Sequence, residues 1–192
     1  MTGCPPPSTP DAALPELLAW LSTAHPEIRV LPKSGSRLCK AIDRALRVVT
    51  FGRQNRFMTD FTTTLGARIY VPDGWGRTPA VERYCVLRHE LVHVAQFRRW
   101  TLPGMAICYL LFPVPFLFAA ARAGWELEAY RESLRAMHAV GLLRPERSAQ
   151  IVAWMVERFT GPDYAWMWVA GGMIREALTR TVSELHGAAD GR

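Results

Sequence analysis

The sequence predicts a single α+β domain that is predominantly helical and has one small β-hairpin. Its 192 residues match the usual size of one domain, and a hydrophobic content of 49% is enough for a buried core. Apolar residues recur at helical spacing along most of the chain, and one short region is rich in β-branched and aromatic residues. We expect the proline-rich residues 1–10 to be a disordered lead-in and residues 11–187 to form the domain.

Two short helices are expected before the hairpin. Asp11 can cap the first, which ends before His25, and Ser36 can cap the second after a loop. The apolar residues that define them are Leu14, Leu17, Leu18 and Leu21 in the first helix and Leu38, Ile42, Ala45 and Leu46 on one face of the second.

Residues 57–64 and 67–71 are the predicted strands of the hairpin, with Leu65-Gly66 as the turn between them. The second strand has two possible roles. It pairs with an extended peptide, or it is a structural strand whose edges are covered.

The rest of the chain is expected to be helical. Thr78 before Pro79 is typical of a helix start, and this helix runs to about Arg99. Further helices are expected over residues 123–140, 145–159 and 163–185. Gly141 ends the first, Pro145 opens the second, and Gly161-Pro162 separates the second from the third.

Composition restricts the compartment and the partners. The net charge is +6, but the basic residues are spread along the chain, so a nucleic-acid partner is not expected. The four cysteines form no C-x-x-C pair, which argues against a disulfide framework and favours a reducing compartment. The first residues lack the basic and apolar regions of a signal peptide, so we expect a cytoplasmic protein.

A metal-binding motif lies inside the helix that starts near Pro79. His89 and His93 are four residues apart and therefore share one helix face, where both imidazoles can bind one zinc ion. Glu90 lies at the edge of that face and can act as general base toward a water on the metal. The same five residues can also occur by chance on a solvated helix face, but a helical context after a hairpin favours the metal site.

The third zinc ligand has to come from elsewhere in the chain. Arg99 stands where a third histidine of the extended motif would be, so a glutamate from a later helix is the alternative. Glu126, Glu128 and Glu132 are the candidates, and Glu126 and Glu128 point about 200° apart around a helix, so only one of these two can face the metal.

From residue 57 to residue 135 the chain resembles the gluzincin class of zinc metallopeptidases. The resemblance implies that His89, His93 and Glu126 are the zinc ligands and Glu90 the base, with Ala129 at the spacing expected after Glu126. Tyr130 stands where the family usually has an aspartate that orients a histidine ligand. The Tyr130 hydroxyl can accept such a bond or donate to the reaction centre. Alternatively, Tyr130 is a core residue without a role in the site. The implied fold is zincin-like and the implied substrate is a peptide or protein.

Two readings of function compete with a zinc endopeptidase. One is a zinc-binding module without proteolytic activity, and the other is a membrane-associated structural protein whose motif is accidental. The 22 uncharged residues 100–121 bear on the second reading, because their length alone would allow a membrane span. A single crossing would separate His89 and His93 from Glu126. The stretch is therefore either a hairpin that dips into one membrane face or a core segment that links the two ligand helices.

Overall fold

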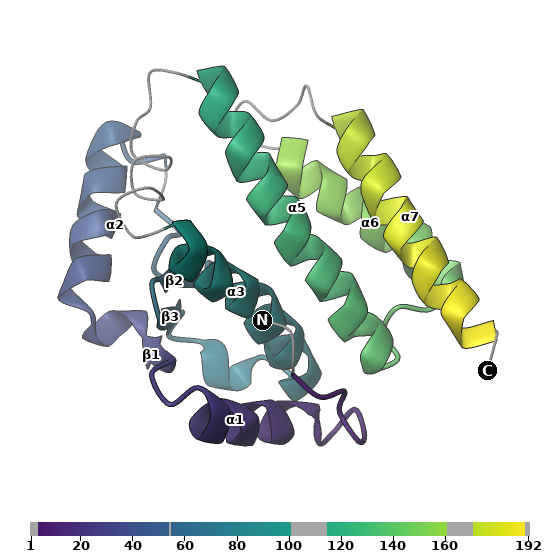
Figure 1. The fold of residues 1–192 in the computed structure, drawn as a ribbon. Helices are drawn as coiled ribbons and strands as arrows, with labels where there is room; N and C mark the ends of the chain where they lie inside the picture. The colour runs from purple at the N-terminus through teal and green to yellow at the C-terminus, as the bar shows by residue number, and fades with distance from the viewer. Residues whose placement is uncertain (1–3, 54, 101–114, 161–170, 191–192) are drawn as a thin grey trace.

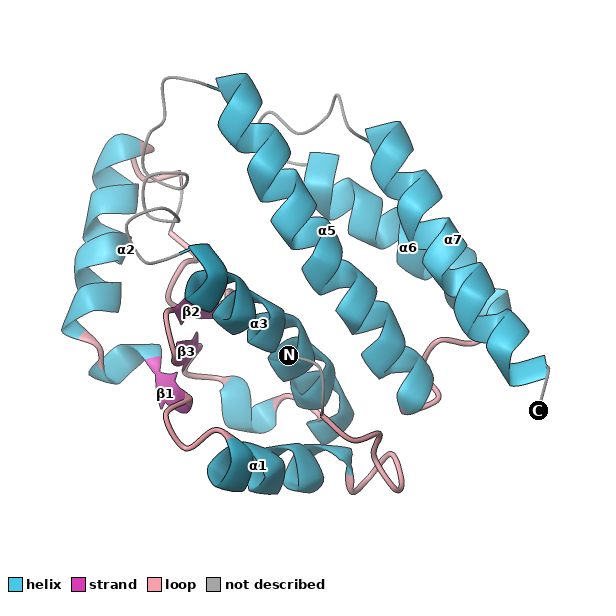
Figure 2. Cartoon of the chain, in the orientation of Figure 1, coloured by secondary structure: helices cyan, strands magenta, loops and turns pink. Residues whose placement is uncertain are grey.

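The computed structural model describes residues 4–53, 55–100, 115–160 and 171–190 (Figure 1). Within these residues the protein is mostly helical, with one three-stranded sheet, and the predicted α+β class is confirmed (Figure 2). The sheet lies between helices α2 (Arg37–Val49) and α3 (Ala80–Trp100), and α5 (Pro115–Ala139), α6 (Pro145–Thr160) and α7 (Gly171–Asp190) lie on the other side of α3.

Helix α1 (Ala13–Ala24) packs against α3 through its leucines. Leu14, Leu17 and Leu21 are buried, whereas Leu18 is partly exposed. The prediction that Asp11 caps this helix was wrong. Ala12 is at the cap position, and the hydroxyl of Thr9 accepts a hydrogen bond from its backbone N–H, because the chain already turns over residues 9–12.

Helix α2 begins as predicted, with the Ser36 hydroxyl accepting a hydrogen bond from the Cys39 N–H. Its four apolar residues lie within about 100° of one another around the helix, as predicted, but only one edge of that face is covered. Ile42 and Leu46 are partly buried, while Leu38 and Ala45 are exposed. At 100° per residue Leu38 and Ala45 are about 80° and 100° from Leu46, at the edge of this face that turns away from the sheet.

The sheet consists of β1 (Arg29–Pro32), β2 (Thr63–Leu65) and β3 (Arg68–Val71), in the order β1-β3-β2. The hairpin of β2 and β3 is confirmed, although β2 is much shorter than residues 57–64. Strand β1 was not predicted, and it pairs in parallel with β3. Both edges of β3 are therefore covered, so of the two roles considered for this strand the structural one is confirmed.

Helices α3 and α5 lie side by side at the centre of the molecule (Figure 1). On one side, apolar residues of α3 pack with α1 and the sheet. On the other, residues of α5 pack with α6 and α7. Representative buried residues are Tyr84, Leu87, Leu91 and Ile69 in the first cluster and Leu134, Met155, Phe159 and Leu178 in the second.

Helix α5 begins at Pro115, eight residues before the expected start, whereas α6 begins as predicted at Pro145. Residues 101–114, which form most of the uncharged stretch, lie outside the described residues, as does the expected start of the last helix at residue 163. The two expectations for residues 100–121, a core segment and a membrane dip, thus fall mostly outside the described residues. Among the described helices, none has both the length and the apolar character needed to cross a membrane.

Candidate metal centre

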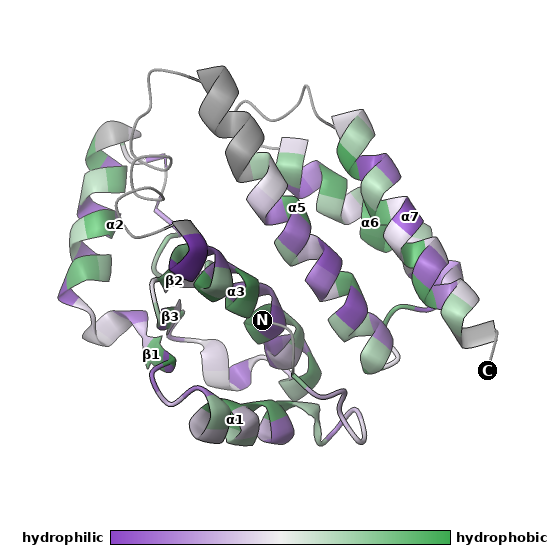
Figure 3. Ribbon diagram, in the orientation of Figure 1, coloured by the Kyte–Doolittle hydropathy of each residue, from purple (hydrophilic) through white to green (hydrophobic). Residues whose placement is uncertain are grey.

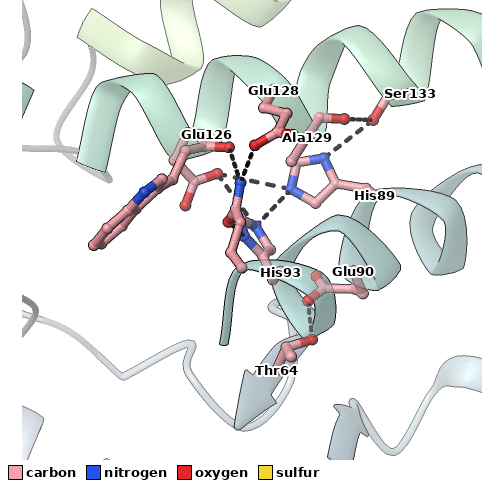
Figure 4. Close-up of polar contacts among 10 residues, drawn as sticks. Thr64, His89, Glu90, His93, Glu126, Glu128, Ala129 and Ser133 are labelled. Carbon is pink, nitrogen blue, oxygen red and sulfur yellow. Dashed lines mark hydrogen bonds and ion pairs between the residues drawn. The ribbon is translucent and has the colours of Figure 1, made fainter. Parts of the chain in front are cut away.

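Three potential ligands from α3 and α5 meet at one point. His89 and His93 project from α3 toward Glu126 on α5 (Figure 4). The two Nε2 atoms are 3.2 Å apart, and Oε2 of Glu126 lies 3.7 Å from Nε2 of His89 and 3.6 Å from Nε2 of His93. The three residues that the sequence and the family resemblance selected as ligands thus lie within contact of one another.

The spacing and chemistry of these atoms fit zinc. Ligand atoms about 2.1 Å from an ion in tetrahedral coordination are separated from each other by about 3.4 Å. The three observed separations lie close to that value. In the described part of the chain no other His, Cys, Asp or Glu joins the group, which thus offers three potential ligands, the number that catalytic zinc sites use.

Ser133 fixes the orientation of His89. Its Oγ donates to the backbone carbonyl of Ala129, 3.2 Å away, and lies 3.1 Å from Nδ1 of His89 (Figure 4). Because the hydroxyl proton is used on Ala129, the oxygen accepts from Nδ1–H of the imidazole. In the neutral ring the lone pair of His89 is then on Nε2, the atom that faces Glu126 and His93, whereas a protonated ring donates to Glu126 from that same atom.

Gln96 fixes the orientation of His93. Its Nε2 donates to the backbone carbonyl of Trp125 at 3.0 Å and to Oε2 of Glu128 at 2.9 Å. Both partners are acceptors, so the amide oxygen must be the atom that faces Nδ1 of His93, at 2.9 Å. The neutral ring of His93 therefore also presents an Nε2 lone pair, and Gln96 connects α3 to α5.

The buried carboxylate of Glu126 needs a positive charge close to it. Burial alone would raise the pKa of Glu126, but hydrogen bonds from His89 and His93 outweigh burial and hold that pKa well below its usual range. Burial would lower the pKa of His93, but the hydrogen bond and charge of Glu126 outweigh it and raise that pKa to about 9. The buried carboxylate thus requires positive charge beside it, from a proton on the imidazole or from a metal ion.

Glu90 lies next to the ligands and is held by the sheet. The residue is buried, and its Oε2 accepts a hydrogen bond of 2.6 Å from Oγ1 of Thr64 in β2 (Figure 4). No further partner of Glu90 is seen in the described residues, which leaves Oε1 to accept or release a proton. This arrangement suits a general base.

The other candidates from the sequence are engaged elsewhere. Glu128 accepts from Gln96, and Glu132 forms an ion pair with Arg88 across the two helices. Tyr130 is buried, and its ring packs edge-on against His89 at a centroid distance of 5.0 Å. Ser133, one turn after Tyr130, is the residue whose side chain contacts Nδ1 of His89.

Sequence reasoning missed three residues near the centre. Ser133 lies two helical turns after Glu126, so helical spacing could have indicated it, whereas Thr64 reaches Glu90 only through tertiary packing. Lys33 is fully buried, and its Nζ donates to the carbonyl of Phe57 at 2.6 Å. Burial lowers the pKa of Lys33 to about 8, although negative charges including Glu90 partly oppose this.

Comparisons of the chain with protein-family models, with curated proteins and with solved structures found no match. The chemistry of this centre is therefore inferred from its side chains alone.

Proposed function

We propose that the protein is a zinc-dependent peptidase with its active site at His89, Glu90, His93 and Glu126. The observation that carries the proposal is the convergence of three ligand atoms, within 4.8 Å of one another, beside a buried glutamate on the same helix. Three ligands leave a coordination position open, as hydrolysis requires.

The protein groups have distinct roles in this proposal. His89, His93 and Glu126 would hold the zinc ion, which when bound supplies Lewis acidity at neutral pH. Glu90 takes a proton from the attacking water at Oε1 and delivers it to the leaving amine nitrogen. Thr64 donates to Oε2 of Glu90, so Oε1 is the oxygen left for the reacting proton.

An edge strand beside Glu90 supports a peptide as the substrate. Strand β2 pairs with β3 on one side only among the described strands, and Thr64 in its middle contacts Glu90. An extended peptide that hydrogen-bonds to the other edge of β2 would bring a scissile bond close to the base. In this proposal β2, rather than β3, takes the role of positioning the substrate.

The decisive experiment separates metal binding from catalysis. Purified protein is assayed for zinc content and for cleavage of casein and of a fluorogenic peptide mixture. We expect Glu90→Gln to retain zinc and to lose at least about 100-fold in activity, since a general base contributes about that much or more. We expect His93→Ala to lose both, because a metal ligand is removed. Glu82→Gln, an exposed position on the same helix, is the matched control and should change neither.

Other outcomes would assign the centre differently. If Glu90→Gln cleaved peptides as fast as the unaltered chain, or if zinc were bound with no hydrolysis at all, the metal would only join α3 and α5, as in a non-proteolytic zinc module. If the purified protein bound no metal even after incubation with zinc, the motif would be accidental, as in the reading of the chain as a structural protein.

A further inference from the structure

Helix α2 has an outer face that the metal centre does not use. The side that packs on the sheet consists of Cys39, Ile42, Asp43 and Leu46. Eight of the other residues form two stripes along the helix, each with positions spaced by three, four and three residues. The cationic stripe is Arg37, Lys40, Arg44 and Arg47, and the apolar stripe is Leu38, Ala41, Ala45 and Val48.

The cationic stripe carries positive charge that is mostly uncompensated. All four of its residues are exposed, and only Arg47 has a carboxylate partner in the described chain, the buried Asp43, at 2.8 Å. Asp43 is also the only acidic residue between Arg37 and Arg53. The outer face of α2 therefore has no exposed carboxylate, and it attracts an anionic partner.

The apolar stripe is exposed beside these cations. Leu38 is 53% exposed and Val48 75%, and Phe51, one turn beyond Val48, is 97% exposed. Phe51 also has a positive φ of 51°, a backbone conformation that favours glycine. A phenylalanine at such a position gains nothing from the fold, because its ring contacts almost no other residue. Figure 3 shows α2 at the edge of the molecule with both hydrophobic and hydrophilic residues along its length.

We propose that the outer face of α2, together with Phe51, docks on a membrane surface that contains anionic phospholipids. The arginines would lie among the headgroups, and Leu38, Val48 and Phe51 would enter the boundary with the acyl chains. A nucleic acid would match only the cationic stripe, and a partner helix only the apolar one. A bilayer interface matches both, since its phosphates lie directly above its hydrocarbon.

Vesicle flotation with the full chain tests this proposal. We expect the protein to float with vesicles of phosphatidylcholine and phosphatidylglycerol but not with phosphatidylcholine alone, and binding should weaken with added salt. The triple variant Arg37→Glu, Lys40→Glu, Arg44→Glu should need at least about tenfold more lipid for half-binding, since each cation near an anionic surface contributes appreciably. None of these positions belongs to the metal centre, so zinc content should not change.

A second variant separates docking from folding. Phe51→Gly removes the exposed ring and places glycine where the backbone has a positive φ, so we expect a raised Tm together with about tenfold weaker vesicle binding. The matched control is Met173→Ser with Arg175→Glu on α7, an exposed methionine and an exposed arginine, and it should bind vesicles like the unaltered chain.

Three results would overturn the proposal. In the first, neither the triple variant nor Phe51→Gly weakens flotation, which would assign binding to another segment. In the second, the protein fails to bind anionic vesicles but binds an oligonucleotide in a manner sensitive to the triple variant. In the third, it forms a dimer in solution that Val48→Ser disrupts, which would make the apolar stripe an interface between two copies of the chain.

Discussion

Replacing Ser133 by alanine is expected to weaken zinc binding without weakening the fold. The substitution removes the acceptor that lies 3.1 Å from Nδ1 of His89 and leaves the imidazole free to rotate or to change tautomer. Ser133 is buried in the middle of α5, and alanine fills nearly the same volume and is the better helix former. Any loss of metal affinity therefore reports on the orientation of His89.

The magnitude follows from the type of bond that is lost. A hydrogen bond between neutral groups contributes about 1 kcal/mol net, and replacing a residue that orients a metal ligand costs about 10- to 100-fold in affinity. The His89 side chain is 16% exposed, so water can partly replace the hydroxyl. We therefore expect the lower end of that range, a Kd for zinc raised about tenfold. The free energy of unfolding of the metal-free protein should change by less than about 1 kcal/mol.

The chain offers a closely matched control. Ser148 on α6 is also buried, its Oγ donates to the carbonyl four residues earlier, and it lies 3.1 Å from a ring nitrogen of His186. Zinc affinity is measured by competition with a chromophoric chelator, and stability by urea unfolding. Ser148→Ala should leave the Kd unchanged. An unchanged Kd in Ser133→Ala, or an equal rise in both variants, would refute the role assigned to Ser133.

Three further predictions concern the residues around the centre. Because the folded-state pKa of Lys33 is about 8 and its ordinary value is 10.5, the unfolded chain binds more protons between these values. The free energy of unfolding should therefore rise by about 3 kcal/mol across that pH window relative to the Lys33→Met variant. Urea unfolding of both proteins at several pH values measures this, and the same pH dependence in both would contradict it. Arg88→Met should cost about 2 kcal/mol, because Glu132, less than one-fifth exposed, loses its closer ion-pair partner and keeps only Arg135, at 3.4 Å. Adding Glu132→Gln should recover part of that cost, whereas simple additivity in a double-mutant cycle would argue against coupling. Thr64→Val should lower peptidase activity about tenfold at unchanged zinc content, since Glu90 loses a hydrogen bond, and loss of zinc would show that Thr64 acts on the ligands instead.

Features that depend on residues close together in the sequence could be predicted. Any helix through His89 and His93 places both imidazoles on one face, and the start of α3 after Pro79 follows from local preferences. The turn at Gly66, which has a φ of 63°, is local in the same sense. These predictions needed no knowledge of the tertiary structure.

Strand β1 shows why other features could not be predicted. Its four residues lack a clear alternation of apolar and polar side chains, and they form a strand because β3, more than thirty residues later, pairs with them in parallel. That pairing also covers the edge of β3, which the sequence left as a possible binding site for a peptide. Local preference is too weak to specify so short a strand without its partner.

The sequence by itself determined the helical class, the hairpin and the pair of histidines on α3, because each of these depends on spacing within one element. Only the tertiary structure brought Ser133 to His89, Gln96 to Glu128 and Thr64 to Glu90. Those contacts depend on how α3 is rotated and shifted relative to α5 and the sheet. Side-chain packing across the whole core fixes that placement, and no periodicity within a single helix encodes it.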